Sequence, residues 1–96
     1  MLIKAGVDIS RLNREIRRSL PRVQDLLDLL DNELTVTSTY EGNHGEGSLH
    51  YCNDAYDIKK PTEWAPGLKE ELQIKLGKSF DVVLESDHLH IEYDPK

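Results

Sequence analysis

The chain has 96 residues and a formal net charge of −6. This length is typical of one domain, so residues 1–96 are expected to form a single domain around one core. The acidic balance argues against general affinity for nucleic acid or anionic membranes, because binding to phosphate groups requires clustered lysine and arginine side chains. The one cysteine, Cys52, excludes an internal disulfide bond.

The amino-terminal segment MLIKAGVDIS lacks the apolar stretch of a secretory signal. Nowhere does the chain approach the roughly 20 apolar residues that a membrane span requires. We therefore expect synthesis in the cytoplasm, without a signal peptide or a membrane span. Action outside the cytoplasm would need another exit route.

Positive charge is concentrated near the amino terminus. Five of the twelve lysine and arginine residues lie in one short stretch: Arg11, Arg14, Arg17, Arg18 and Arg22. The ordinary interpretation of such a stretch is the solvated face of a helix. The alternative is a docking patch for an anionic surface or partner.

The first third of the chain predicts two helices separated by Pro21. The first follows the possible caps Asp8 and Ser10 and ends before the proline. The second opens at Pro21 and extends over roughly residues 21–32. The apolar residues at helical spacing are Ile9, Leu12, Ile16 and Leu20 in the first helix and Val23, Leu26, Leu27 and Leu30 in the second.

The pattern changes to that of a strand in residues 34–40, LTVTSTY, which are rich in threonine, valine and tyrosine. Residues 41–48, EGNHGEGS, contain three glycines and predict a loop that can bring backbone close to a ligand.

Residues 50–58 are expected to be extended again. Successive side chains of a strand point to opposite faces, so Ala55 and Asp57 would share one face and Tyr56 and Ile58 the other. A face with a possible functional carboxylate, Asp57, would thus lie opposite a face that packs in the core.

The last third predicts a third helix and a hairpin. The spacing of Leu68, Leu72 and Leu76 indicates a helix that Gly77 closes. Residues 80–84 and 88–93 indicate two strands joined by a tight turn. The expected fold is therefore α+β, with a small antiparallel sheet packed against two or three helices.

The four histidines suggest a metal site, because all of them lie after residue 43 in or beside predicted strands and loops. Catalytic zinc takes three protein ligands from His, Asp, Glu or Cys and leaves a fourth position for water. His50 and Asp57 can reach one ion from a bent extended segment, and His90 can supply the third ligand from the hairpin. Taken alone, such spacings also occur on ordinary polar surfaces.

Hairpin geometry distinguishes two candidate general bases. With Ser86 and Asp87 as a two-residue turn, Glu85 lies opposite His88, and cross-strand partners point to the same face. His88 and His90 share that face, so Glu85 lies beside the proposed ligand His90. Asp87 remains the alternative base if the turn is longer.

Two stretches of the chain resemble a known superfamily. Residues 36–58, VTSTYEGNHGEGSLHYCNDAYDI, and residues 79–95, SFDVVLESDHLHIEYDP, resemble the zinc D-Ala-D-Ala carboxypeptidases, lysostaphin-type endopeptidases and hedgehog signalling domains. They are most similar to small stand-alone, phage-type members of the D-Ala-D-Ala carboxypeptidase-like group.

The resemblance implies a ligand set. SLHY followed by AYDI is similar to the family's first two ligands, here His50 and Asp57, and HLH is similar to its closing motif, which makes His90 the third. His44 stands where hedgehog-like domains keep a histidine six residues before the first ligand. The acidic residue at the head of the hedgehog turn corresponds to Glu85, whereas some carboxypeptidases place the acid where Asp87 stands.

The resemblance also implies a function. It predicts a zinc-dependent peptidase that hydrolyses a peptide or amide bond in peptidoglycan stem or cross-link peptides, and whose exit route would be phage lysis or a virion. His88 or His44 would stabilise the oxyanion. Many cell-wall members carry an arginine after the strand before the loop, where this chain has TYEG at residues 39–42. A second expectation is therefore a non-catalytic binding module of hedgehog-like fold that zinc stabilises.

Overall fold

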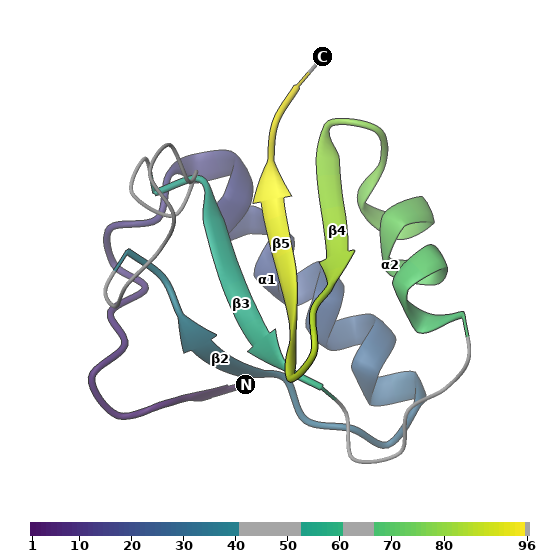
Figure 1. Cartoon of the computed structure of the whole chain (residues 1–96), viewed down its shortest axis with the longest axis horizontal. Helices are drawn as coiled ribbons and strands as arrows, with labels where there is room; N and C mark the ends of the chain where they lie inside the picture. The colour runs from purple at the N-terminus through teal and green to yellow at the C-terminus, as the bar shows by residue number, and fades with distance from the viewer. Residues whose placement is uncertain (41–52, 61–66, 96) are drawn as a thin grey trace.

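Figure 1 shows the fold of the chain as a computed structural model, a five-stranded sheet with two helices packed against it. The structure describes residues 1–40, 53–60 and 67–95. The expected α+β class is confirmed at this level.

The sheet has the strand order β1-β2-β3-β5-β4. Its strands are β1 (Leu2–Ile3), β2 (Thr35–Ser38), β3 (Ala55–Lys59), β4 (Phe80–Leu84) and β5 (His88–Tyr93). The prediction of a purely antiparallel sheet is wrong in one respect, because β1 pairs with β2 in parallel while the other neighbours are antiparallel. A two-residue strand is too short to produce an alternating pattern in the sequence.

The prediction of two helices around Pro21 is also wrong. A single helix, α1 (Arg14–Leu29), continues through the proline and crosses behind the sheet. Ile16, Leu20, Val23 and Leu27 are all buried, and their spacing of four, three and four residues keeps one apolar stripe on both sides of Pro21. Burial of this stripe outweighs the local cost of a proline within a helix.

The residues expected to cap the first helix have another role. Asp8 Oδ1 accepts hydrogen bonds from the backbone N–H and the hydroxyl of Ser10, at 2.8 and 2.6 Å. The helix begins six residues after Asp8, and the side chain of Asn13, the residue before it, donates to Asp54 Oδ1 at 2.8 Å. This bond ties the start of α1 to the start of β3.

The last third of the chain agrees with its prediction. Helix α2 (Leu68–Leu76) is closed by Gly77 with φ of 91°, a conformation that favours glycine. The hairpin of β4 and β5 has the expected register, because the N–H of Glu85 donates to the carbonyl of His88 at 2.9 Å. Ser86 and Asp87 are thus the two residues of the turn.

The two faces of the sheet differ in chemistry. The face that packs against the helices carries Tyr56 and Ile58 of β3 and Leu89 and Ile91 of β5, all fully buried. The residues that alternate with them, including Asp57 and His90, point to the opposite face. The predicted alternation in β3 is therefore confirmed, and it places polar side chains on the two central strands.

Helix α2 covers part of the outer edge of the sheet. The side chain of Gln73 accepts a hydrogen bond from the N–H of Val82 at 3.0 Å and donates to the carbonyl of Phe80 at 2.5 Å. These bonds satisfy outward-facing backbone groups of β4, which protects an edge strand from pairing with other chains. They also hold the hairpin that carries His88 and His90.

Within the described ranges, neither helix has the length and apolar composition needed to cross a membrane.

Candidate metal centre

The register of the two central strands places Asp57 of β3 directly opposite His90 of β5. Asp57 Oδ1 lies 3.0 Å from His90 Nδ1, and the two side chains are 10% and 15% exposed. Two residues that lie 33 positions apart in the sequence thus form a shielded, charge-assisted pair.

The second ring nitrogen of His90 has its own carboxylate partner. Nε2 lies 2.7 Å from Oε1 of Glu92, two residues further along β5. Burial of the ring lowers the pKa of His90, but the hydrogen bonds and charges of Asp57 and Glu92 outweigh it, so the pKa lies above its usual value. Without a metal ion, the site therefore favours an imidazolium that donates to both carboxylates.

His88 approaches the other oxygen of Asp57, at 3.6 Å from Nε2 to Oδ2. Its Nδ1 lies 2.6 Å from Oδ1 of Asp87 in the turn. This hydrogen bond with His88 lowers the pKa of Asp87. Both histidines of the HLH motif therefore contact Asp57, as expected of residues that share one face of a strand.

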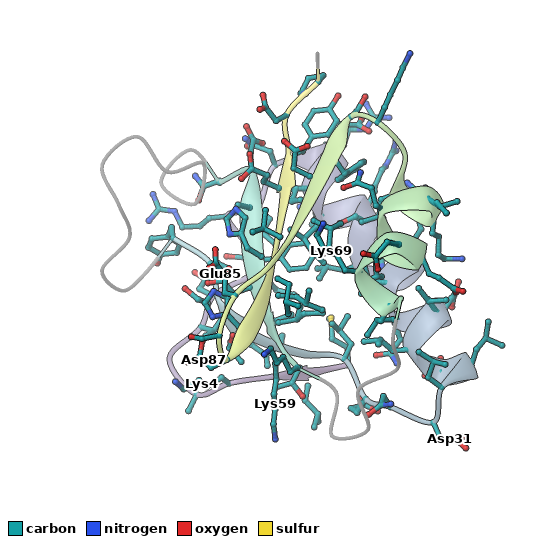
Figure 2. The ribbon with its side chains drawn as sticks, turned by 45° about the vertical axis from the view of Figure 1, so that its right-hand side comes forward. Lys4, Asp31, Lys59, Lys69, Glu85 and Asp87 are labelled. Atoms are coloured by element: carbon teal, nitrogen blue, oxygen red, sulfur yellow. The ribbon has the colours of Figure 1, made fainter. Side chains whose placement is uncertain are left out.

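Glu85 lies at the hairpin turn, exposed to solvent and paired through its backbone with His88 (Figure 2). The carbonyl of Ser86 in the same turn accepts a hydrogen bond from Lys60 Nζ at 2.7 Å. Since Lys60 directly follows β3, this bond fixes the turn relative to the strand that carries Asp57.

Two histidines of the expected site lie in a segment that the structure does not describe. His50, the first expected ligand, and His44, an expected oxyanion partner, lie outside the described residues. The structure therefore brings together two of the three expected zinc ligands, Asp57 and His90, with His88 beside them.

Two donors of the expected zinc site, Asp57 and His90, lie close enough to share an ion. Ligands about 2.0–2.2 Å from zinc in tetrahedral geometry lie about 3.4 Å apart. Asp57 Oδ1 and His90 Nδ1 lie 3.0 Å apart, slightly closer than this value. One carboxylate and one imidazole can thus take a common ion after small movements, with further ligands still needed.

A second acidic group lies on the same sheet face. Carboxylate oxygens of Asp81, Glu92 and Asp94 all lie within 4.8 Å of one another, so these three residues could also hold a metal ion. We did not expect this group from the sequence, although the hairpin register that pairs Glu85 with His88 also pairs Asp81 with Glu92. The proximity of Asp81 and Glu92 could therefore have been predicted from the hairpin register.

All five arginines of the basic stretch are exposed, and two of them make specific contacts. The guanidinium of Arg11 lies 4.5 Å from the ring centroid of Tyr40, a cation–π geometry, and Arg22 donates a hydrogen bond to the carbonyl of Lys75. Arg14, Arg17 and Arg18 are exposed on α1. The helix-surface interpretation therefore accounts for these residues.

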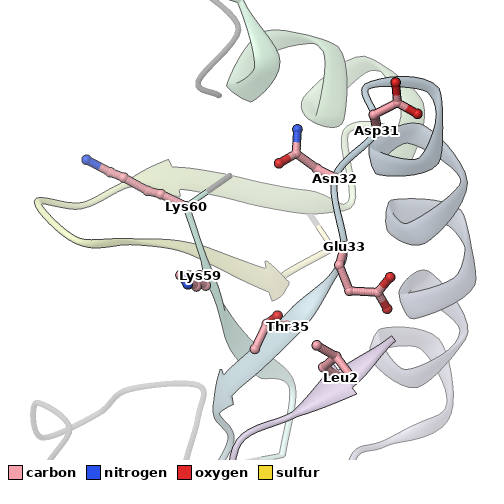
Figure 3. A pocket seen from close by; sticks show the side chains of 7 residues that line it. All are labelled: Leu2, Asp31, Asn32, Glu33, Thr35, Lys59 and Lys60. Atoms are coloured by element: carbon pink, nitrogen blue, oxygen red, sulfur yellow. The ribbon is translucent and has the colours of Figure 1, made fainter. Parts of the chain in front are cut away.

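A pocket of about 240 Å³ lies where β2 begins and β3 ends (Figure 3). Its described lining combines acidic and basic side chains: Leu2, Asp31, Asn32, Glu33, Thr35, Lys59 and Lys60. Neither Asp57 nor His90 is among these lining residues.

Comparisons of the chain with protein-family models, curated proteins and solved structures find no match.

Proposed function

We propose that this chain is a zinc-dependent peptidase that hydrolyses a peptide or amide bond, with the stem or cross-link peptides of peptidoglycan as substrate. The observation that carries the proposal is the contact of Asp57 with His90 at 3.0 Å on the polar face of the central strands. The motif resemblance supplies the substrate class, a hedgehog-like fold and a third ligand, His50.

In this proposal, each residue of the site has a distinct task. Asp57 and His90 would hold the ion with His50, and zinc at this site would lower the pKa of a bound water toward about 7 and polarise the scissile carbonyl. Glu85 accepts the proton of the attacking water and returns it to the leaving amine. His88, oriented by Asp87, donates to the oxyanion, with His44 as the alternative donor.

The hydrogen bond between Asp87 and His88 supports Glu85 over Asp87 as the base. This bond lowers the pKa of Asp87, which makes its carboxylate a weaker proton acceptor. Asp87 is therefore better suited to orient His88.

The test is mass spectrometry of peptidoglycan digests made with zinc-loaded protein, with and without a chelator. We expect new amino termini that the chelator abolishes. Asp57→Ala should lose both zinc and activity, whereas Glu85→Gln should keep zinc and lose at least about 100-fold in activity, as for removal of a general base. Glu71→Gln on α2 is the matched control, and an active Glu85→Gln protein would exclude Glu85 as the base.

A binding module that zinc stabilises is the second candidate. Thr39 stands in the segment where many cell-wall enzymes carry an arginine, and its buried hydroxyl donates to the carbonyl of Asp8 at 2.9 Å. This position thus has a structural role in the chain. If zinc-loaded protein binds peptidoglycan without releasing amino termini, the module is the better description.

A further inference from the structure

Glu92 has no task in the proposed function, yet it makes one of the shortest hydrogen bonds of the site. Its Oε1 lies 2.7 Å from Nε2 of His90, while the other ring nitrogen faces Asp57 at 3.0 Å. A histidine whose two nitrogens face different carboxylates has its ring orientation fixed from both sides. Only one of the two nitrogens can bind a metal ion together with Asp57, and that nitrogen is Nδ1.

The position of Glu92 favours this bond. Glu92 and His90 lie two residues apart on β5, so their side chains share the polar face of the sheet. The cross-strand partner of Glu92 on β3 is Ala55, whose small side chain leaves room for the side chain of Glu92. The side chains of His90 and Glu92 are 15% and 21% exposed, and hydrogen bonds to charged groups are stronger when shielded from water.

We propose that Glu92 is a positioning residue for the metal site, which accepts a hydrogen bond from Nε2–H of His90 and thereby directs Nδ1 toward the metal. This inference rests on the proposed function, because it requires Asp57 and His90 to be metal ligands. Metal-bound histidines commonly donate their second N–H to a carboxylate, and removal of that partner commonly weakens metal binding by about 10–100-fold.

The acidic group around Glu92 provides a matched control. Asp81 lies opposite Glu92 in the hairpin register, and both belong to the group of three carboxylates on this face. Asp81→Asn removes a neighbouring negative charge and keeps the hydrogen bond between Glu92 and His90. The two substitutions therefore separate a directed hydrogen bond from a general effect of charge.

The first measurement is the zinc dissociation constant of the full chain, from competition with a chromophoric chelator. We expect Glu92→Ala to raise it by about 10–100-fold. Glu92→Gln should have a smaller effect, because its amide oxygen still accepts from Nε2–H. Asp81→Asn should change it by less than about threefold, since it removes a neighbouring charge that solvent screens. Equal losses in Glu92→Ala and Asp81→Asn would overturn the proposal in favour of a charge effect.

The second measurement reports on the ring itself. Long-range ¹⁵N–¹H spectra of the zinc-bound protein should show the proton of His90 on Nε2, and the Nε2–H resonance should be lost to solvent exchange in Glu92→Ala. Amide spectra establish that each variant is folded, which we expect because Glu92 lies outside the hydrophobic core. A zinc-bound His90 that carries its proton on Nδ1 would overturn the assignment.

Failure of this inference can be distinguished from failure of the proposed function. If Asp57→Asn weakens zinc binding and Glu92→Ala does not, the metal site stands and the role of Glu92 is excluded. If zinc binding depends on Asp81 and Asp94 and not on Asp57, the ion occupies the acidic group, and both proposals are excluded.

Discussion

Ser19 and Tyr56 form a buried pair of hydroxyl groups between α1 and β3, at 2.8 Å. The hydroxyl of Ser19 donates to the carbonyl of Ile16 at 2.6 Å, so its single proton is already used. Tyr56 must therefore be the donor of the shared hydrogen bond. Burial raises the pKa of Tyr56, so its hydroxyl keeps the proton that this bond requires.

This assignment predicts unequal effects of two conservative substitutions. Ser19→Ala leaves the buried O–H of Tyr56 without an acceptor and should lower the free energy of unfolding by about 1–3 kcal/mol. Tyr56→Phe leaves Ser19 bonded to Ile16 and should cost only about 0.5–1.5 kcal/mol. Urea denaturation measures both values, and the double variant should lose less than their sum. The reverse order would assign the donor to Ser19.

A second prediction at the residue scale concerns Asp8. The hydrogen bonds from Ser10 lower its pKa, so its contribution to stability is present above the ordinary aspartate pKa of about 3.9 and is lost as the pH falls through the lower folded value. Ser10→Ala should raise the pKa of Asp8 in a ¹³C-carboxyl NMR titration. The stability difference between the two proteins should be constant above about pH 5 and shrink below pH 4. The pKa of Asp87, lowered by a different partner, serves as the internal control.

At the scale of elements, helix α1 contains Pro21, a residue type that disfavours the interior of a helix. Pro21 lacks the N–H that would bond the carbonyl of Arg17, and both residues are exposed. The carbonyl can therefore bond to water. The apolar stripe that continues past Pro21 explains why tertiary packing keeps a single helix.

Pro21→Ala should therefore stabilise the protein. The substitution restores a backbone hydrogen bond and removes a steric clash, which together stabilise the folded state by about 3 kcal/mol. It also gives the unfolded chain more conformational entropy, which lowers stability by about 0.4–1 kcal/mol. We expect a net gain of about 1–3 kcal/mol in thermal or urea denaturation. Asp25→Ala, at an exposed position of the same helix, should change stability by less than about 0.5 kcal/mol. Destabilisation by Pro21→Ala would indicate that the helix is interrupted at the proline.

At the scale of the whole molecule, the proposed zinc ion would connect the two central strands. Asp57 and His90 belong to β3 and β5, and the described residues share one hydrophobic core behind these strands. A small domain has little stability in reserve, so a ligand that binds only the folded state has a large effect.

Zinc at 100 times its dissociation constant should raise the free energy of unfolding by about 2.7 kcal/mol. For a domain of this size, each kcal/mol shifts the melting temperature by about 4–8 °C. Calorimetry should thus show a rise of about 10–20 °C on zinc addition, reversed by a chelator. Asp57→Ala should melt at the same temperature with and without zinc, and an unchanged wild-type melting temperature would argue against the metal site.

Local patterns in the sequence were sufficient for several elements. The hairpin register, the bounds of α2 and the alternation of Tyr56 and Ile58 with Asp57 follow from strand and helix periodicity and from turn chemistry, which act between near neighbours. The HLH motif and Asp57 could be selected as candidate ligands for the same reason.

Only the tertiary structure decided which distant groups meet. The continuity of α1 through Pro21 depends on burial against the sheet, and the parallel pairing of β1 with β2 depends on contacts between segments more than thirty residues apart. The placement of His90 between Asp57 and Glu92 likewise depends on the register of β3 with β5. Periodicity fixes which face a side chain takes, but strand order and register, set by packing of the whole core, fix which partner it finds there.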